Sequence, residues 1–247
     1  MNKLFKVFAL AALMVFGGQA MAQSSNGTMF LGASFPVGHF NNGDFDTWSL
    51  TDENLASRNG GASIGGNVGL KWNFGVGVPG LSVMLSADGF YNGLNADLKE
   101  YFYERDIELK NNQLVSSYVL SRPRYVNVPV MVGLNQVFYL TPSFAVYFEG
   151  GLGANARIIT KYNETVKYVG NVTTTTEYKY RTAFSFAYQF GLGFEVSKKF
   201  VIGTSFYDLG ASKVLAERTV PVFGTDTYKN EKGVRPMMML VRIGFKF

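Results

Sequence analysis

The sequence predicts an all-β fold, an eight-stranded antiparallel up-and-down transmembrane β-barrel. Three observations predict it. Eight stretches alternate between apolar and polar residues with a period of two, and almost none has the helical period of about 3.6 residues. Long and short connections take turns between these stretches. One face of the stretches carries large apolar side chains, whereas the other carries glycine, small and polar residues.

The first three predicted strands are residues 28–36, 63–75 and 80–91. The second shows the alternation most clearly. Its apolar face carries Ile64, Val68, Leu70, Trp72 and Phe74. Its other face carries Gly65, Asn67, Gly69, Lys71 and Asn73. The third strand adds Asp88 to the polar face, so charged residues share one side with glycine.

The fourth and fifth predicted strands are residues 123–138 and 143–160. The fourth contains Pro129, which cannot donate a ladder hydrogen bond, so we expect a local bulge there. The fifth places Glu149 and Arg157 on its polar face. The strands run to roughly nine to eighteen residues, longer than globular strands of about five or six and suited to a tilted bilayer crossing.

The last three predicted strands are residues 181–196, 199–209 and 235–247. The sixth has six consecutive large residues on one face: Phe184, Phe186, Tyr188, Phe190, Leu192 and Phe194. The eighth is apolar on one face to its last residue, Phe247, while its other face carries Arg242 and Lys246.

The connections alternate strictly in length. Long polar segments are residues 37–62, 92–122, 161–180 and 210–234, and short turns are residues 76–79, 139–142 and 197–198. All long segments therefore fall at one end of the barrel, as external loops, and the short periplasmic turns fall at the other with both termini. The segment 161–180 alternates too, so we expect a hairpin that turns near Gly170 and Asn171.

The apolar face is expected to meet lipid, with the polar face enclosed. Six large side chains from one strand, repeated around a closed sheet, would overfill a small barrel. An Arg or Lys turned towards the middle of the bilayer would cost about 2 to 4 kcal/mol. In hydrocarbon only a closed sheet satisfies the hydrogen bonds of every strand.

The enclosed face predicts a structural charge network in the lumen. Its members are Lys71, Asp88, Glu149, Arg157, Glu195, Arg242 and Lys246. These charges could instead line an ion path. We favour the structural network because eight strands enclose a space that side chains about fill.

Aromatic residues beside the tight turns predict a membrane-interface girdle, since amphipathic rings favour the headgroup boundary. Its members are Trp72, Phe74, Phe138, Tyr139, Phe144, Phe194, Phe200, Phe245 and Phe247.

The N-terminus predicts a secretory signal peptide, residues 1–22. A basic start precedes an apolar run from Val7 to Phe16, and small residues lead to a cleavage site after Ala22. The run of about ten residues is shorter than the roughly 20 of a membrane-spanning helix. We therefore expect an exported chain with a barrel domain at residues 23–247.

Composition excludes several classes of function. Removing Lys3 and Lys6 leaves 21 basic against 18 acidic residues, a mature charge of about +3 spread along the chain, so no nucleic-acid partner is expected. With no cysteine, the exported chain has no disulfide framework and depends on packing or a membrane. We also expect no cofactor and no metal site.

No catalytic site is predicted, so we expect the protein not to be an enzyme. His39 is the only histidine, and its neighbour Ser34 is interpreted as a chance pairing. The acidic stretch at residues 103–110 lacks calcium-loop spacing and is interpreted as a solvated loop. In the acidic segment 41–54, Trp48 is a candidate contact for a protein or glycan.

With these features the chain resembles small Gram-negative outer-membrane β-barrel families, and most nearly the PorT-like outer-membrane β-barrel domain. The resemblance rests on the signal peptide, the strand RYVNVPVMVGLN (124–135), the GLG steps at 151–153 and 191–193, and the aromatic last strand. It implies the cell outer membrane, contact with outer-membrane lipid, and assembly by the barrel-assembly machinery through the C-terminal strand. Some members are implicated in secretion or adhesion.

The expected function is non-enzymatic: a membrane-anchored scaffold or adhesion-type protein with a side-chain-filled lumen, whose long loops contact an envelope or extracellular protein or glycan. The alternative is a passive small-solute porin or a component of a PorT-like secretion complex. An outer-membrane enzyme that uses His39 is a third hypothesis.

Overall fold

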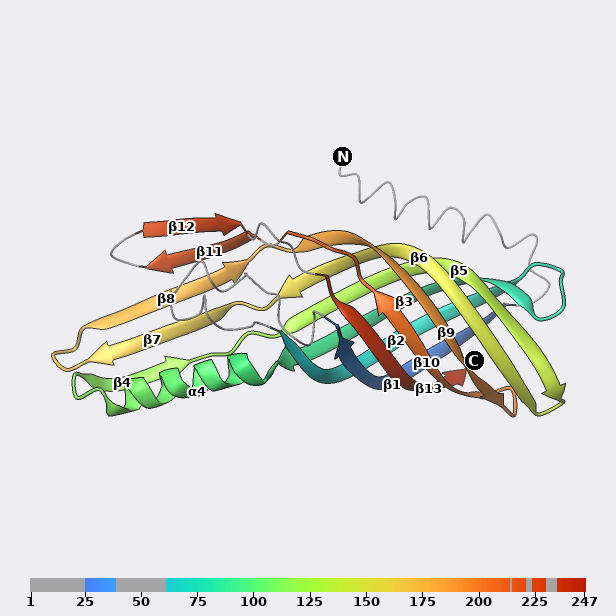
Figure 1. The fold of residues 1–247 in the computed structure, drawn as a ribbon, viewed down its shortest axis with the longest axis horizontal. Coiled ribbons are helices and arrows are strands. Elements are labelled where there is room, and N and C mark those ends of the chain that lie inside the picture. Colours follow the sequence, from blue (N-terminus) through green and yellow to red (C-terminus); the bar gives the residue numbers. More distant parts are fainter. Residues whose placement is uncertain (1–24, 39–60, 214, 221–223, 230–234) are drawn as a thin grey trace.

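The computed structural model describes residues 25–38, 61–213, 215–220, 224–229 and 235–247. Eight strands form a closed antiparallel barrel in the order β1-β13-β10-β9-β6-β5-β3-β2 (Figure 1). They are β1 (Ser25–Val37), β2 (Ala62–Gly75), β3 (Leu81–Leu94), β5 (Tyr125–Thr141), β6 (Phe144–Ile159), β9 (Ala183–Val196), β10 (Phe200–Asp208) and β13 (Met237–Lys246). The predicted fold class is confirmed. The predicted signal peptide, His39 and Trp48 lie outside the described residues.

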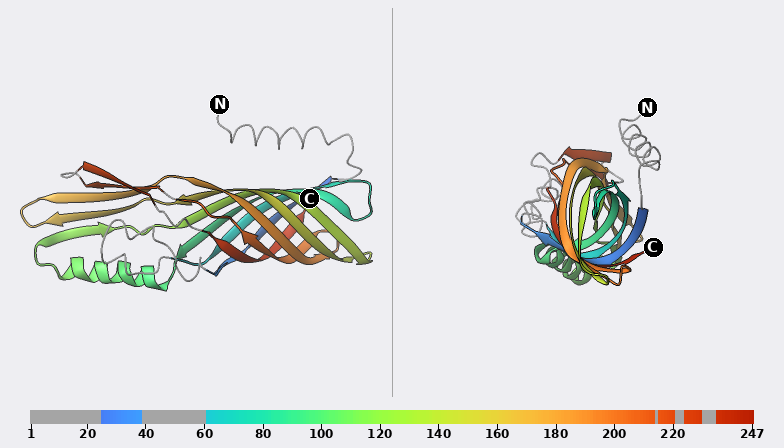
Figure 2. Two further views of the ribbon diagram at one scale, coloured as in Figure 1. Left: turned by 45° about the horizontal axis from the view of Figure 1, so that its top comes forward. Right: turned by 90° about the vertical axis from the view of Figure 1, so that its right-hand side faces the viewer.

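The first and last strands close the barrel. β1 pairs with β13 from Thr28 opposite Lys246 to Val37 opposite Met237, and its other edge pairs with β2. Each barrel strand thus has a neighbour on both sides, and the strands form a ring when seen along the long axis (Figure 2). A closed ring leaves no strand edge with unpaired backbone groups.

The bulge expected at Pro129 is absent. Pro129 lies opposite Asn155 in an unbroken register with β6. On its other side, the ladder with β3 pairs Ala87 with Val130 and then Phe90 with Asn127, in the same register. The missing N–H is therefore accommodated by a gap in one ladder, without an inserted residue.

Three short turns join the barrel strands at one end, which we call the tight-turn end. In the first, Gly77 and Gly80 have φ values of 81° and 76°. In the turn between β9 and β10, Ser197 and Lys198 have φ values of 54° and 57°, the left-handed pair of a type I′ hairpin. These two turns match those expected at residues 76–79 and 197–198. The turn expected at residues 139–142 is shorter than predicted, because β5 continues to Thr141 and β6 begins at Phe144.

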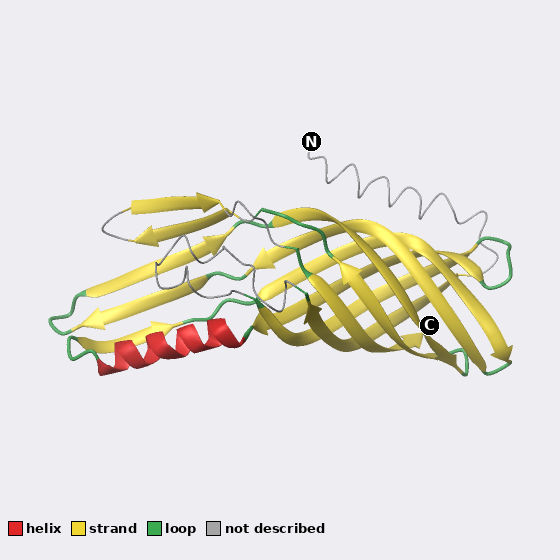
Figure 3. Ribbon diagram, in the orientation of Figure 1, coloured by secondary structure: helices red, strands yellow, loops and turns green. Residues whose placement is uncertain are grey.

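At the opposite end the chain continues into a second sheet, which with one helix we call the extension. The sheet has the order β12-β11-β8-β7-β4 and continues the long axis of the barrel (Figures 1 and 3). Its strands are β4 (Val115–Leu120), β7 (Tyr162–Tyr168), β8 (Thr173–Tyr180), β11 (Leu215–Val220) and β12 (Gly224–Lys229). The hairpin expected near Gly170 and Asn171 is confirmed, with φ values of 95° and 64° at these residues.

The sequence interpretation of residues 92–122 as a loop is wrong. Helix α4 (Ala96–Asn111) occupies much of it, and strand β4 follows. The Asn95 side chain caps the helix by accepting a hydrogen bond from the Leu98 N–H, 3.1 Å away. The buried face of α4 carries only Leu98, Phe102 and Leu109. Because charged residues surround them in the sequence, no clear apolar repeat of helical period is visible. No helix among the described residues is long and apolar enough to cross a membrane.

The two faces of the barrel wall differ in exposure. On the outside, Phe186 is 65% exposed and Ile243 is 63% exposed. On the inside, Arg242 is 2% exposed, one residue from Ile243 in the same strand. Bulky apolar side chains therefore point outward while charged side chains are enclosed, which is the orientation expected of a barrel surrounded by lipid.

Glycine in the wall makes room for the interior. A Cβ atom added to Gly244 would lie 2.6 Å from Cδ1 of Phe30, which is buried inside the barrel. A Cβ atom added to Gly66 would meet nothing within 4 Å. Gly244 is therefore required by close packing, and Gly66 is not.

We predict that Gly244→Val lowers the free energy of unfolding by about 1 to 3 kcal/mol, because the added carbons overpack the interior. Gly66→Val is the matched control and should leave stability unchanged or slightly higher. Urea unfolding of both variants in detergent micelles measures the difference. Equal stability of the two variants would contradict the packing argument.

Candidate functional site

Four charged side chains from four strands meet inside the barrel, and we call them the central quartet: Lys71 (β2), Asp88 (β3), Glu149 (β6) and Arg242 (β13). The Lys71 Nζ lies 2.7 Å from Glu149 Oε2. Arg242 bridges the two carboxylates, contacting Asp88 Oδ1 at 3.4 Å and also bonding Glu149. Two positive and two negative charges therefore balance in a site that is almost closed to solvent.

Neutral side chains complete the bonding of the two carboxylates. Ser205 donates to Glu149 Oε1 at 3.3 Å. Tyr207 donates to Asp88 Oδ2 at 2.8 Å, and the Asn67 amide donates to Asp88 Oδ1 at 3.4 Å. Each buried carboxylate thus accepts bonds from several donors, as a buried charge requires.

Two inward aromatic rings pack against the cations. The Arg242 guanidinium lies 4.2 Å from the centre of the Phe30 ring. The Lys71 Nζ lies 5.1 Å from the same centre and 4.7 Å from that of Tyr147. These cation–π contacts fix the cations in place and fill the space around them.

Towards the extension, the interior combines an apolar cluster with buried polar side chains that include Asn92, Asn127 and Arg157. One buried cluster runs from the end of the barrel next to the extension into the extension itself. It contains Phe90, Leu94, Leu98, Phe102, Tyr162, Tyr207 and Leu240 among others. Phe90 and Tyr207 pack edge to face, with ring centres 5.3 Å apart. Among the described residues, apolar packing at the mouth of the barrel therefore continues into the extension.

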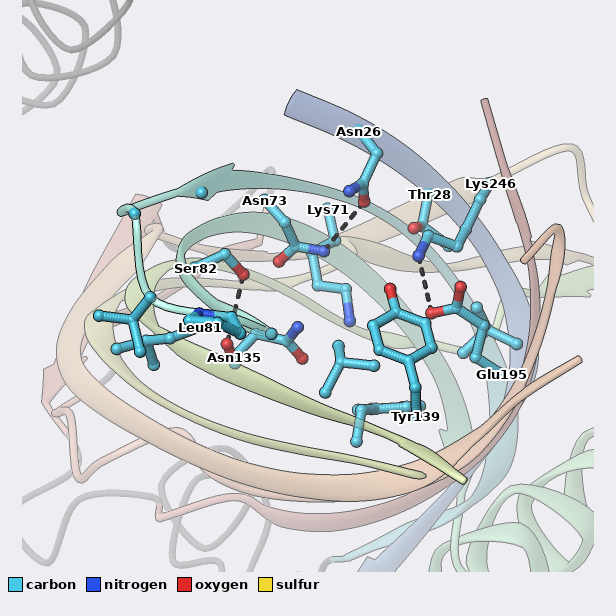
Figure 4. Close-up of a pocket in the computed structure, with 18 residues that line it drawn as sticks. Asn26, Thr28, Lys71, Asn73, Leu81, Ser82, Asn135, Tyr139, Glu195 and Lys246 are labelled. Carbon is cyan, nitrogen blue, oxygen red and sulfur yellow. Dashed lines mark hydrogen bonds and ion pairs between the residues drawn. The ribbon is translucent and has the colours of Figure 1, made fainter. Parts of the chain in front are cut away.

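Towards the tight turns, the interior opens into a polar recess of about 270 Å³, which we call the vestibule (Figure 4). Lys246 and Glu195 form an ion pair in it, 2.7 Å apart. The Asn73 amide donates to Asn26 Oδ1 at 3.3 Å. Lys71 and Tyr147 also line the vestibule, so it ends at the central quartet.

The seven residues predicted as one lumen network lie in three places. Lys71, Asp88, Glu149 and Arg242 form the central quartet, and Glu195 and Lys246 pair in the vestibule. Arg157 lies near the extension, where it donates to Ser212 Oγ at 2.7 Å and to the Gly210 carbonyl at 3.2 Å. The structure therefore separates Arg157 from the quartet.

The nine residues predicted as a girdle lie near the tight turns, and some of their rings pair across neighbouring strands. Phe144 stacks on Phe194 with ring centres 5.6 Å apart, and Phe200 meets Phe245 edge to face at 5.7 Å. Trp72, Phe138 and Phe247 are exposed on the outside, and Phe74 is half-buried. Tyr139 instead lines the vestibule inside the barrel, so its predicted place in the girdle is wrong.

Three important interior residues were not foreseen from the sequence: Phe30, Tyr147 and Tyr207. All three stand on the inward face by the period of two, so parity alone could have placed them. Among the described residues, no three His, Asp or Glu side chains are grouped so that they could hold a metal ion. The acidic stretch 103–110 lies on α4.

A family model described as outer membrane protein beta-barrel domain matches residues 8–247. Similar solved structures include OprG from Pseudomonas aeruginosa (13% identity, TM-score 0.47, covering 92% of this chain and 97% of that one) and Ail, the attachment invasion locus protein of Yersinia pestis (13%, 0.39, 91% and 100%). At such identities the likeness concerns the fold alone. No curated protein sequence matches.

We predict that Glu149→Gln destabilises the protein by about 3 to 5 kcal/mol, because it leaves Lys71 and Arg242 with too little negative charge in a buried site. The matched control is Glu177→Gln, which breaks the more exposed pair with Lys161 and should cost less than about 1 kcal/mol. Urea unfolding measures both.

The double variant Lys71→Met with Glu149→Gln restores the charge balance of the quartet and should recover part of the loss. If Glu149→Gln unfolds at the same urea concentration as Glu177→Gln, the quartet does not have the structural role assigned to it.

Proposed function

Because the chain belongs to the family of outer membrane protein beta-barrel domains, we propose that it is a non-enzymatic surface protein whose barrel anchors the extension outside the cell. The barrel lies in the outer membrane, surrounded by its lipid. The proposed activity is adhesion-type: the extension contacts an extracellular protein or glycan.

The proposal rests on one observation: the interior of the barrel is occupied by side chains, whereas the long-loop end is folded into the extension. The described interior is occupied by an apolar cluster at its mouth and by a charge-balanced quartet below it. The long-loop end, in contrast, is built into a five-stranded sheet with a helix. A protein whose task was passive transport would require the opposite arrangement, with an open lumen.

The extension is rigid enough to present a defined surface. Arg105 on α4 bonds Glu164 on β7 at 2.6 Å and Glu108 at 2.7 Å, and the hydrogen bonds with Glu164 raise the pKa of Arg105. Tyr162 and Tyr178 stack with ring centres 4.2 Å apart. These contacts tie the helix and the sheet into one body.

Delivery and assembly follow the same proposal. We infer export through residues 1–22 with cleavage after Ala22, and recognition of the aromatic C-terminal strand by the barrel-assembly machinery. The ring of aromatic residues near the tight turns would then settle at the periplasmic headgroup boundary. A closer relation to PorT-like proteins stays a prediction.

We predict no large, steady conductance when the purified protein is recorded in planar lipid bilayers, because side chains fill the lumen. An open porin recorded in the same lipid is the positive control. Large, steady openings by this protein would favour the passive-porin alternative and contradict the filled lumen.

We also predict that removing the outer part of the extension abolishes adhesion but not barrel folding. Tyr162 and Tyr178 are register partners, so residues 163–177 can be replaced by an Asn-Gly turn. Cells that display the wild-type or the shortened protein are compared for binding to heparin-agarose and to immobilised basement-membrane extract. Heat-dependent gel migration checks that the barrel is folded.

Equal binding by the two sets of cells to both probes would contradict the proposed function. Stable co-purification of the wild-type protein with a periplasmic or outer-membrane secretion complex would favour the PorT-like alternative.

A further inference from the structure

The far end of the extension carries three exposed aliphatic side chains, which we call the aliphatic tip: Leu114, Val169 and Val172. They are 66%, 66% and 59% exposed. Leu114 follows α4, whereas Val169 and Val172 belong to the turn between β7 and β8. Two chain segments far apart in the sequence therefore expose apolar groups at the same place, at the end of the molecule opposite the tight turns (Figure 1).

Backbone hydrogen bonds hold the tip together. The Val169 N–H donates to the Leu114 carbonyl at 2.8 Å, which joins the two segments. The Tyr168 N–H donates to the Val172 carbonyl at 2.7 Å and closes the hairpin turn. The Leu114 N–H donates to Asn112 Oδ1 at 3.0 Å. The three apolar side chains are thus presented by a pre-formed backbone, which lowers the entropy cost of binding.

Two lysines lie next to the tip. Lys110 lies in the last turn of α4, and Lys167 lies two residues before Val169. Both are exposed, and neither forms an ion pair with a carboxylate in the part of the chain that the structure describes. On the flank below them, Glu108 and Glu164 are both held by Arg105.

Such a tip matches a lipid surface better than it matches a protein. Protein interfaces are centred on Trp, Tyr and Arg anchors, while Leu and Val are under-represented among their dominant residues. Three aliphatic side chains at the end of a hairpin offer little area for a protein, but they can enter the boundary between headgroups and acyl chains. Lysines beside them suit anionic headgroups.

We propose that the aliphatic tip inserts into the surface of an apposed lipid bilayer that carries anionic headgroups. Leu114, Val169 and Val172 enter the bilayer boundary, and Lys110 and Lys167 contact the headgroups. The inference rests on the proposed function for the outward position of the extension. Each tip binds weakly, and many copies on one cell bind together.

The test uses the full mature chain in nanodiscs of phosphatidylcholine. Nanodiscs are mixed with larger vesicles of phosphatidylcholine, alone or with added phosphatidylglycerol, and the protein that floats with the vesicles is measured. Empty nanodiscs provide the background. We expect the wild type to float with the anionic vesicles, and the double variant Leu114→Ser with Val169→Ser to lose about tenfold or more of that binding.

The matched control is Ile107→Ser with Val119→Ser, which removes two exposed aliphatic side chains, 39% and 66% exposed, from the flank of the same extension. It should float like the wild type. Lys110→Gln with Lys167→Gln should reduce flotation with anionic vesicles to the level seen with neutral ones.

No flotation by the wild type, or equal losses in the tip and flank variants, would overturn the proposal. Flotation that does not depend on phosphatidylglycerol would overturn the role of the lysines. Retained binding to heparin-agarose or basement-membrane extract without vesicle flotation would reject this inference alone, whereas vesicle flotation without binding to those probes would reject the proposed adhesion to protein or glycan.

Discussion

The enclosure of charge behind an apolar wall is the constraint on which the rest of this structure depends. In hydrocarbon, a strand can satisfy its backbone only within a closed sheet, and a charged side chain can point only inward. The four side chains of the central quartet all point inward. Their positive and negative charges balance, and both carboxylates accept hydrogen bonds. At wall positions such as Gly244, a larger side chain would clash with side chains buried in the interior.

The side chains packed in the described interior are the reason why we propose that function resides in the extension. Cation–π contacts of Phe30 and Tyr147 surround the quartet, and the apolar cluster above it continues into the extension. Barrel and extension therefore share one apolar cluster, which agrees with the proposal that the barrel supports the extension. The vestibule is a recess at the tight-turn end, opposite the extension.

The barrel could be predicted well from the sequence because alternation with a period of two identifies each strand, its length and the face on which each side chain lies. The eight strands and the outward direction of Phe186 and Ile243 follow from parity alone. The alternation of side chains along a strand does not determine which charged residues come into contact. Lys71 lies on β2 and Glu149 on β6, which are not neighbouring strands. Their contact across the lumen depends on the tilt of the strands in the barrel. Helix α4 was missed because its buried face has only three apolar residues among charges, and the Pro129 bulge was wrong because the ladder tolerates a gap.

A cysteine scan along β9 tests the central orientation most directly, and the absence of native cysteine makes each label unique. Single cysteines from Phe184 to Phe190, labelled with an NBD fluorophore, are read in vesicles that contain brominated lipid. The account predicts strong quenching at Phe184, Phe186 and Phe190, and weak labelling or quenching at Ser185 and Gln189. Quenching at the second set instead of the first would show that the polar face meets lipid and would contradict the account.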